Sequence, residues 1–195
     1  STSEILSKVN LTVSCAFEKG AFGREHSHAF IGPLNKTDEH TYAIMAPNAA
    51  TYNVFALPVE APSFGTRKIV TNPWDITASP EGWHSDGVNL YTYTRGNNAF
   101  AYTDLNSTNT VGAVAEGGAN RNFDFPLDIT QHHSTYQDAA VTNLFYINNM
   151  THDIMYRFGF TEAARNFQTN NFGKGGLGKD EVAAQARDGI NLATP

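Results

Sequence analysis

Residues 143–160 read NLFYINNMTHDIMYRFGF, and this stretch decides the fold of the chain. Apolar side chains recur at helical spacing through it and through the residues just before it. These positions cover more than one face, so we expect a long helix that is buried on several sides. Ser134 or Asp138 is suited to cap the start of this helix, and Gly159 is its natural stop.

Four polar residues interrupt the apolar surface of this helix: Asn148, Asn149, His152 and Asp153. Adjacent residues on a helix point about 100° apart, so we expect His152 and Asp153 not to face each other. His152 should instead share a stripe with Asn148, Asn149 and Tyr156. Two interpretations stand here, a catalytic or ligand histidine and a structural set of polar groups satisfied inside the core. The second is favoured, because buried polar groups need partners and a rigid helix can supply them.

The rest of the chain favours strands and loops. It contains 19 Asn and 20 Thr residues, which prefer turns, caps and strands to long helices. We expect strands at 4–18 and at Thr41–Met45, and short strands broken by turns from 51 to about 125. A second, shorter helix should run from Thr161 to about Phe167, and a glycine loop at 173–178 should precede a last strand near 181–187. The predicted fold class is therefore α+β, strand-rich with one long buried helix.

Charge and composition exclude several classes of protein. The net charge of −6 argues against nucleic-acid binding, which requires a basic face. The sequence contains no run of 18 apolar residues, so we expect no membrane span. Cys15 is the only cysteine, which excludes a disulfide framework and a cysteine-based zinc site. In the alternation around it, Cys15 is expected to be a buried strand residue.

The segment at 143–160 resembles the N-L-F-Y-x-x-N-x-x-H-D-x-x-Y-x-x-G-F segment of the fungalysin family of secreted zinc metallopeptidases. The similarity extends over about residues 51–195, and the helix is also similar to one in the N-terminal subdomain of thermolysin. Further matching motifs lie at 71–75, 83–87, 94–98, 162–168, 170–178 and 187–189. The resemblance implies a thermolysin-like N-terminal subdomain and an extracellular location.

The first fifty residues differ from the rest. The segment from Glu4 to Asn10 resembles the last strand of the family's pro-region, which folds over the enzyme and is removed on activation. The resemblance therefore implies a division of the chain, with residues 1–50 as the C-terminal tail of the pro-region and residues 51–195 as the N-terminal subdomain of the catalytic domain. The pro-region would then be an internal partner of the peptidase.

The family's zinc site is an H-E-x-x-H helix with a further glutamate downstream, and this chain contains no His-Glu dipeptide. We therefore expect a fragment, with catalytic residues and metal ligands assigned to none of these 195 residues. Zinc would belong to the full-length parent only. The fragment alone should be inactive.

The resemblance implies that the parent is a secreted zinc-dependent endopeptidase that hydrolyses protein or peptide substrates. In thermolysin-like enzymes one edge strand pairs with the extended substrate. Lys179, Asp180 and Glu181, just after the glycine loop, are the candidate residues for that edge. The alternative is a non-catalytic, peptidase-like module that binds protein or carbohydrate.

Overall fold

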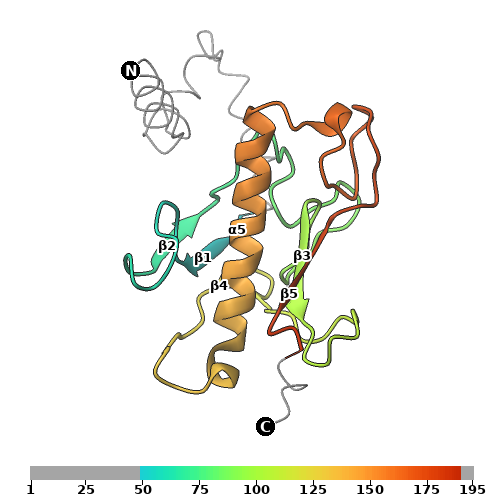
Figure 1. The fold of residues 1–195 in the computed structure, drawn as a ribbon. Helices are drawn as coiled ribbons and strands as arrows, with labels where there is room; N and C mark the ends of the chain where they lie inside the picture. Colours follow the sequence, from blue (N-terminus) through green and yellow to red (C-terminus); the bar gives the residue numbers. More distant parts are fainter. Residues whose placement is uncertain (1–48, 190–195) are drawn as a thin grey trace, which may run out of the picture. The chain divides into compact units, whose positions relative to one another are not determined.

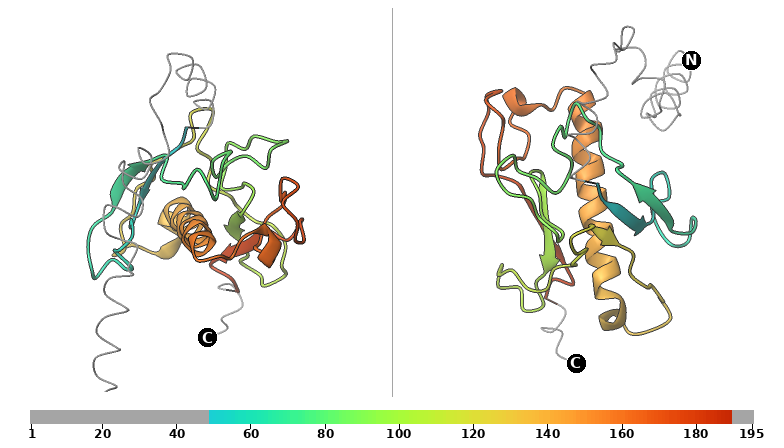
Figure 2. Two further views of the ribbon diagram at one scale, coloured as in Figure 1. Left: turned by 90° about the horizontal axis from the view of Figure 1, so that it is seen from above. Right: turned by 180° about the vertical axis from the view of Figure 1, so that it is seen from behind.

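The computed structural model of the protein describes residues 49–189, and the predicted strands at 4–18 and Thr41–Met45, with Cys15, lie outside them. Within this range a single long helix, α5 (Gln137–Arg157), lies between two small β-sheets (Figure 1, Figure 2). Strands and this helix together make the fold α+β, which confirms the predicted class.

The first sheet has the strand order β2-β1-β4. Its central strand β1 (Thr51–Val54) is antiparallel to β2 (Lys68–Thr71) and parallel to β4 (Asn122–Phe123). Tyr52 and Val54 are fully buried while their neighbours are half-buried, as expected for a strand with one covered face. This sheet therefore contributes its large side chains to the core under α5.

The second sheet pairs β3 (Ala99–Thr103) with β5 (Val182–Ala186) in parallel. Three of its buried positions, Ala99, Ala101 and Ala184, carry alanines, which allow a close approach of the backbone to α5. The register joins Ala99 to Val182 and Thr103 to Ala186. The predicted last strand near 181–187 is thus confirmed, and it pairs with a strand about eighty residues earlier in the chain.

The start of α5 differs from the prediction. A short 3₁₀ turn, η2 (His133–Tyr136), precedes it, and Tyr136 at the N-cap makes no side-chain capping hydrogen bond. Neither Ser134 nor Asp138 caps the helix; Asp138 lies in its first turn, where a carboxylate interacts favourably with the helix dipole. The end follows the prediction, because Gly159 has a φ of 96° and stops the helix.

The predicted second helix is much shorter than expected. Only a 3₁₀ turn, η3 (Glu162–Ala164), forms there. Arg165 adopts the left-handed conformation with a φ of 65°, and the backbone N–H of Asn166 returns to the carbonyl of Thr161 at 3.2 Å. The prediction of a helix to Phe167 was wrong because the left-handed Arg165 ends the helical conformation after a single turn. Local helix propensity does not predict this end.

An aromatic cluster forms the centre of the core. The Tyr52, His84 and Phe123 rings are nearly parallel, and Phe145 of α5 stacks on His84 at 4.8 Å between centroids. Burial, with a further contribution from the charge of Arg121, lowers the pKa of His84 to about 3. His84 is therefore a neutral core residue at ordinary pH. Among the helices of residues 49–189, none is both long and apolar enough to cross a membrane.

Candidate functional site

Asp153 is the most heavily bonded side chain on α5, although it is only 1% exposed. Its carboxylate accepts the backbone N–H of Asp75 at 2.9 Å, the hydroxyl of Ser79 at 2.7 Å and the indole N–H of Trp83 at 2.9 Å. All three donors belong to the loop that runs from 72 to 98. The Asp153 cluster, comprising Asp153, Asp75, Ser79, Trp83 and His152, therefore fastens this loop to the helix.

His152 and Asp153 do face each other, contrary to the prediction. The His152 Nδ1 atom lies 2.9 Å from Asp153 Oδ1, and the His152 Nε2 atom lies 3.2 Å from the side-chain nitrogen of Asn166. The Cα–Cβ bonds diverge by about 100° along the helix, but side chains with two rotatable bonds can curve back toward each other. Both ring nitrogens of His152 therefore have partners inside the chain.

The two asparagines of α5 point to different surroundings. Asn149 is fully buried and accepts the amide N–H of Asn98 at 3.1 Å, while its own amide donates to the Phe145 carbonyl. Asn98, just before β3, also accepts a hydrogen bond from Gln168 at 3.1 Å. Asn148, in contrast, donates only to the Leu144 carbonyl one turn earlier. Asn149 thus links the helix to the second sheet, whereas Asn148 lies on another face.

A second polar set, which no sequence pattern indicated, lies at the end of α5 and in the segments that follow it. The carboxylate of Glu162, only 2% exposed, accepts the hydroxyl of Tyr156 at 2.9 Å and the ammonium of Lys174 at 3.0 Å. Burial and the neighbouring carboxylate raise the pKa of Tyr156. Lys174 lies twelve positions after Glu162, so no local pattern indicates this pair.

This second polar set holds the glycine loop against η3. At Gly176, with a φ of 73°, an added Cβ would lie 1.8 Å from the Glu162 carbonyl oxygen, so only glycine fits. The loop's backbone therefore approaches η3 closely, and its path toward β5 is set by tertiary contacts.

The candidate edge residues follow this loop. The backbone N–H of Lys179 donates to the Thr169 carbonyl at 2.9 Å, and that of Asp180 donates to the Gln168 carbonyl at 3.4 Å. The Asp180 carboxylate also accepts the backbone N–H of Gln168 at 3.2 Å. These two residues use their backbone donors within the chain, so of the three candidates only Glu181 retains a free backbone donor toward the other described residues.

One edge of β5 is open within the described residues. The backbone N–H of Val182 donates to the Asn98 carbonyl at 3.0 Å, toward β3. Since backbone groups alternate in direction along a strand, those of Glu181 and Ala183 point the other way. No described strand pairs with that side. The Glu181 side chain lies 3.6 Å from the guanidinium of Arg95.

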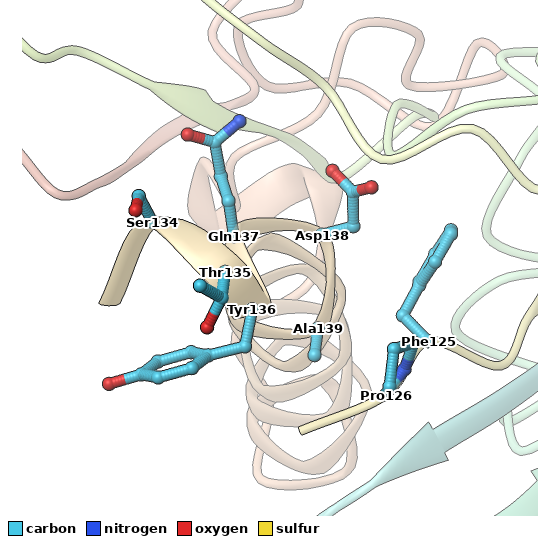
Figure 3. A pocket seen from close by; sticks show the side chains of 8 residues that line it. All are labelled: Phe125, Pro126, Ser134, Thr135, Tyr136, Gln137, Asp138 and Ala139. Carbon is cyan, nitrogen blue, oxygen red and sulfur yellow. The ribbon is translucent and has the colours of Figure 1, made fainter. Parts of the chain in front are cut away.

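Among the hollows of the described surface, two can be compared, and neither gathers catalytic side chains. One, of about 200 Å³, lies between the first turn of α5 and the segment after β4, where Asp138 is the only carboxylate (Figure 3). The other, of about 550 Å³, lies beside Lys179 and includes Asp86. Hydrogen bonds from Asn89 and Tyr91 hold the pKa of Asp86 at about 2, against the opposing effect of burial, so this carboxylate is a structural acceptor.

The described residues also hold no group of three or more His, Cys, Asp or Glu side chains placed to bind a metal ion. The set that the geometry brings together is instead the Asp153 cluster with Asn149, on the buried face of α5. What this arrangement can do chemically is hold one helix, one loop and one sheet in fixed positions, since nearly all of its hydrogen-bonding groups have partners within the chain.

Comparison with known proteins places the described residues among peptidases. The family model described as fungalysin metallopeptidase (M36) matches residues 51–194. Extracellular metalloproteinase 5 of Arthroderma otae is 42% identical over 166 residues, which are 82% of this chain and 26% of that protein. Extracellular metalloproteinase 5 of Trichophyton tonsurans is 43% identical over 152 residues, 75% of this chain and 25% of that protein.

A third relative, extracellular metalloproteinase 1 of Arthroderma gypseum, is 43% identical over 153 residues, which are 75% of this chain and 24% of that protein. The chain thus spans about a quarter of the length of the curated relatives it matches. The matched region includes every described strand and helix.

Proposed function

Because the chain belongs to the fungalysin metallopeptidase family, we propose that it is the N-terminal portion of a secreted, zinc-dependent endopeptidase that hydrolyses protein substrates. The observation that carries this proposal is the family match, which starts at Thr51, the first residue of β1. Residues 51–195 then belong to the catalytic domain, and residues 1–50 form the tail of the pro-region. The relatives' names, extracellular metalloproteinases, support the extracellular location.

Zinc does not fit the residues that the structure describes, because they supply no set of three ligands. In this proposal the zinc ligands and the general base lie outside residues 1–195. No step of hydrolysis is therefore assigned to a side chain of this chain, and the fragment alone is inactive.

The role of this portion is to build one wall of the substrate cleft. The open edge of β5 supports it, since an unpaired strand edge presents the backbone donors and acceptors that an extended peptide can pair with. Glu181 contributes its backbone, while Lys179 and Asp180 anchor the segment through Thr169 and Gln168. Substrate would then add to β5 on the side away from β3.

The polar residues of α5 hold this wall in place. Asp153 and His152 tie the 72–98 loop and Asn166 to the helix. Asn149 ties the helix to Asn98, the residue just before β3. Asn148 donates to the carbonyl of Leu144 within the helix itself. Their internal pairing supports a structural role over a ligand or catalytic role.

The deciding experiment compares the full-length secreted protein with residues 1–195 alone. We expect the full-length protein to hydrolyse casein, to lose this activity with a zinc chelator and to regain it with zinc. The 195-residue chain should show neither hydrolysis nor stoichiometric zinc. Chelator-sensitive hydrolysis by the short chain would contradict the fragment's inactivity, and a full-length protein without metal-dependent hydrolysis would indicate the non-catalytic binding module.

Processing gives an independent test of the division between pro-region and catalytic domain. N-terminal sequencing of the mature secreted protein should find a start near Thr51. A mature protein that begins upstream of Glu25 would contradict the assignment of residues 1–50 to a pro-region.

A further inference from the structure

Two asparagines within residues 49–189 begin an N-x-S/T sequence, the acceptor motif for N-linked glycosylation in secreted proteins. The first sequence, N-S-T, begins at Asn106 in the loop that follows β3, and the second, N-M-T, begins at Asn149 inside α5. Neither has a proline at its middle position, which would exclude the modification. The motif therefore does not distinguish the two asparagines, and their surroundings decide between them.

The fold closes Asn149 to a glycan. Its side chain is 0% exposed, and its amide nitrogen, the atom to which a sugar would be attached, donates to the Phe145 carbonyl at 2.9 Å. The oxygen of the same amide accepts a hydrogen bond from Asn98 at 3.1 Å. A sugar on this nitrogen would need space that a close-packed core does not contain. A chain with this fold therefore carries an unmodified Asn149.

Asn106 has the opposite surroundings. It begins a continuous run of exposed residues, 106–113, in the loop that leaves the end of β3 (Figure 1). Its side-chain amide has no hydrogen-bond partner among residues 49–189. A bulky and hydrophilic group attached here would therefore displace no contact of the described residues.

The loop also keeps its shape without the side chain of Asn106. The carboxylate of Asp104, which is only 3% exposed, accepts the backbone N–H of Thr108 at 3.1 Å and that of Asn109 at 2.6 Å. These bonds fix the turn from both sides of Asn106. A substituent on the Asn106 amide consequently leaves the hydrogen bonds that define the turn in place.

From these observations we propose that Asn106 is an N-linked glycosylation site of the mature protein and that Asn149 is not. In the modification, the Asn106 amide nitrogen forms a bond to the anomeric carbon of a pyrophosphate-linked oligosaccharide donor. The bond between that carbon and the donor's phosphate oxygen breaks, the lipid pyrophosphate leaves with the electron pair, and the amide loses one proton. The proposal rests on the proposed function in one respect, the extracellular location, which takes the chain through the secretory pathway.

Site-specific mass spectrometry of the full-length protein tests this assignment. The protein is secreted by a yeast host under that host's signal peptide, and its glycans are removed with peptide N-glycosidase in heavy-oxygen water. The enzyme converts each glycosylated asparagine to an aspartate that contains heavy oxygen. We expect this label at Asn106 and no label at Asn149.

Two variants that each remove one hydroxyl from the same loop provide a matched comparison. Thr108→Ala destroys the acceptor sequence and should abolish the label at Asn106. Ser107→Ala keeps the acceptor sequence and should retain the label, although it loses the hydrogen bond from the Ser107 hydroxyl to Asp188 at 2.8 Å. An unlabelled Asn106 in the secreted wild-type protein, or a label that persists in Thr108→Ala, would overturn the proposal. A labelled Asn149 would contradict the selection of the site by burial.

The label does not depend on peptidase activity. Loss of casein hydrolysis with Asn106 labelled would count only against the proposed function. An active peptidase with an unlabelled Asn106 would count only against the glycosylation site.

Discussion

Both sides of α5 differ from those of an ordinary surface helix, because the buried side includes polar residues beside apolar ones and the exposed side includes apolar ones. The buried side carries Asn149 and Asp153, whose polar atoms are paired with the loop and sheet beneath. On the exposed side, Met155 is 44% exposed and Phe158, just after the helix, is 63% exposed. Polar groups can be buried where every one finds a partner, and apolar groups can lie outside a partial core where another element covers them. The contrast shows that the pairing of polar atoms, and not apolarity alone, decides which residues of α5 are buried.

The largest expected effect comes from breaking the polar side. Asp153→Ala leaves the donors of Asp75, Ser79 and Trp83 without their acceptor, so we expect a loss of about 3–5 kcal/mol in the free energy of unfolding. Urea denaturation of the 195-residue chain measures it. Asp138→Ala, in the exposed first turn of the same helix, is the control and should change stability little. Equal effects of the two variants would mean that the Asp153 cluster does not hold the fold.

The core beneath the polar side should respond to pH through His84. Its pKa is about 3 in the folded protein and about 6.5 when unfolded, so below pH 6.5 the unfolded chain takes up a proton that the folded one does not. The contribution of His84 to the free energy of unfolding is therefore fully present above pH 6.5. It falls as the pH is lowered toward 3, by at most about 1.4 kcal/mol per pH unit. Between pH 6.5 and 4.5 the expected loss is about 2–3 kcal/mol.

Urea denaturation at several pH values measures this change of the free energy of unfolding with pH. His84→Gln should remove most of it, whereas Asp86→Asn should retain it, because the Asp86 carboxylate, with a pKa of about 2, stays ionised in the folded protein over this range. A wild-type slope that persists in His84→Gln would contradict the assignment to His84.

His152 separates a structural from a catalytic interpretation of the polar side. His152→Ala leaves the amide of Asn166 without its partner and should lower the free energy of unfolding by about 1–3 kcal/mol. Thermal melts and turnover are measured on the same full-length variant. A fall in turnover with an unchanged melting temperature would favour a catalytic histidine instead.

The smallest expected effect concerns the open edge of the sheet that covers the polar side. Glu181→Pro removes a backbone donor and should reduce kcat/KM of the full-length enzyme by an amount equivalent to about 1 kcal/mol or more, with the fold intact. Glu181→Gln keeps the donor while it loses the charge facing Arg95, and it should retain kcat/KM. Unchanged peptide kinetics in the proline variant would mean that this edge serves packing only.

The sequence by itself determined the long helix, its stop at Gly159, the last strand and the family. These features depend on local spacing, on the preference of glycine for positive φ and on a distinctive segment at 143–160, all of which are present in the linear order of residues. The pattern also predicted that α5 is buried on several sides; within the described residues its buried positions face the two sheets, whereas Thr151 and Met155 are exposed.

Only the tertiary structure decided which residues meet. Contacts between segments distant in the chain determine the pairing of β3 with β5, the ion pair of Glu162 with Lys174 and the early end of the second helix. The bond between His152 and Asp153 depends on side-chain rotamers that are selected within the packed core. Helical phase fixes only the direction of each Cα–Cβ bond, and burial then selects the partners, because a buried polar atom without one would cost about 1–3 kcal/mol.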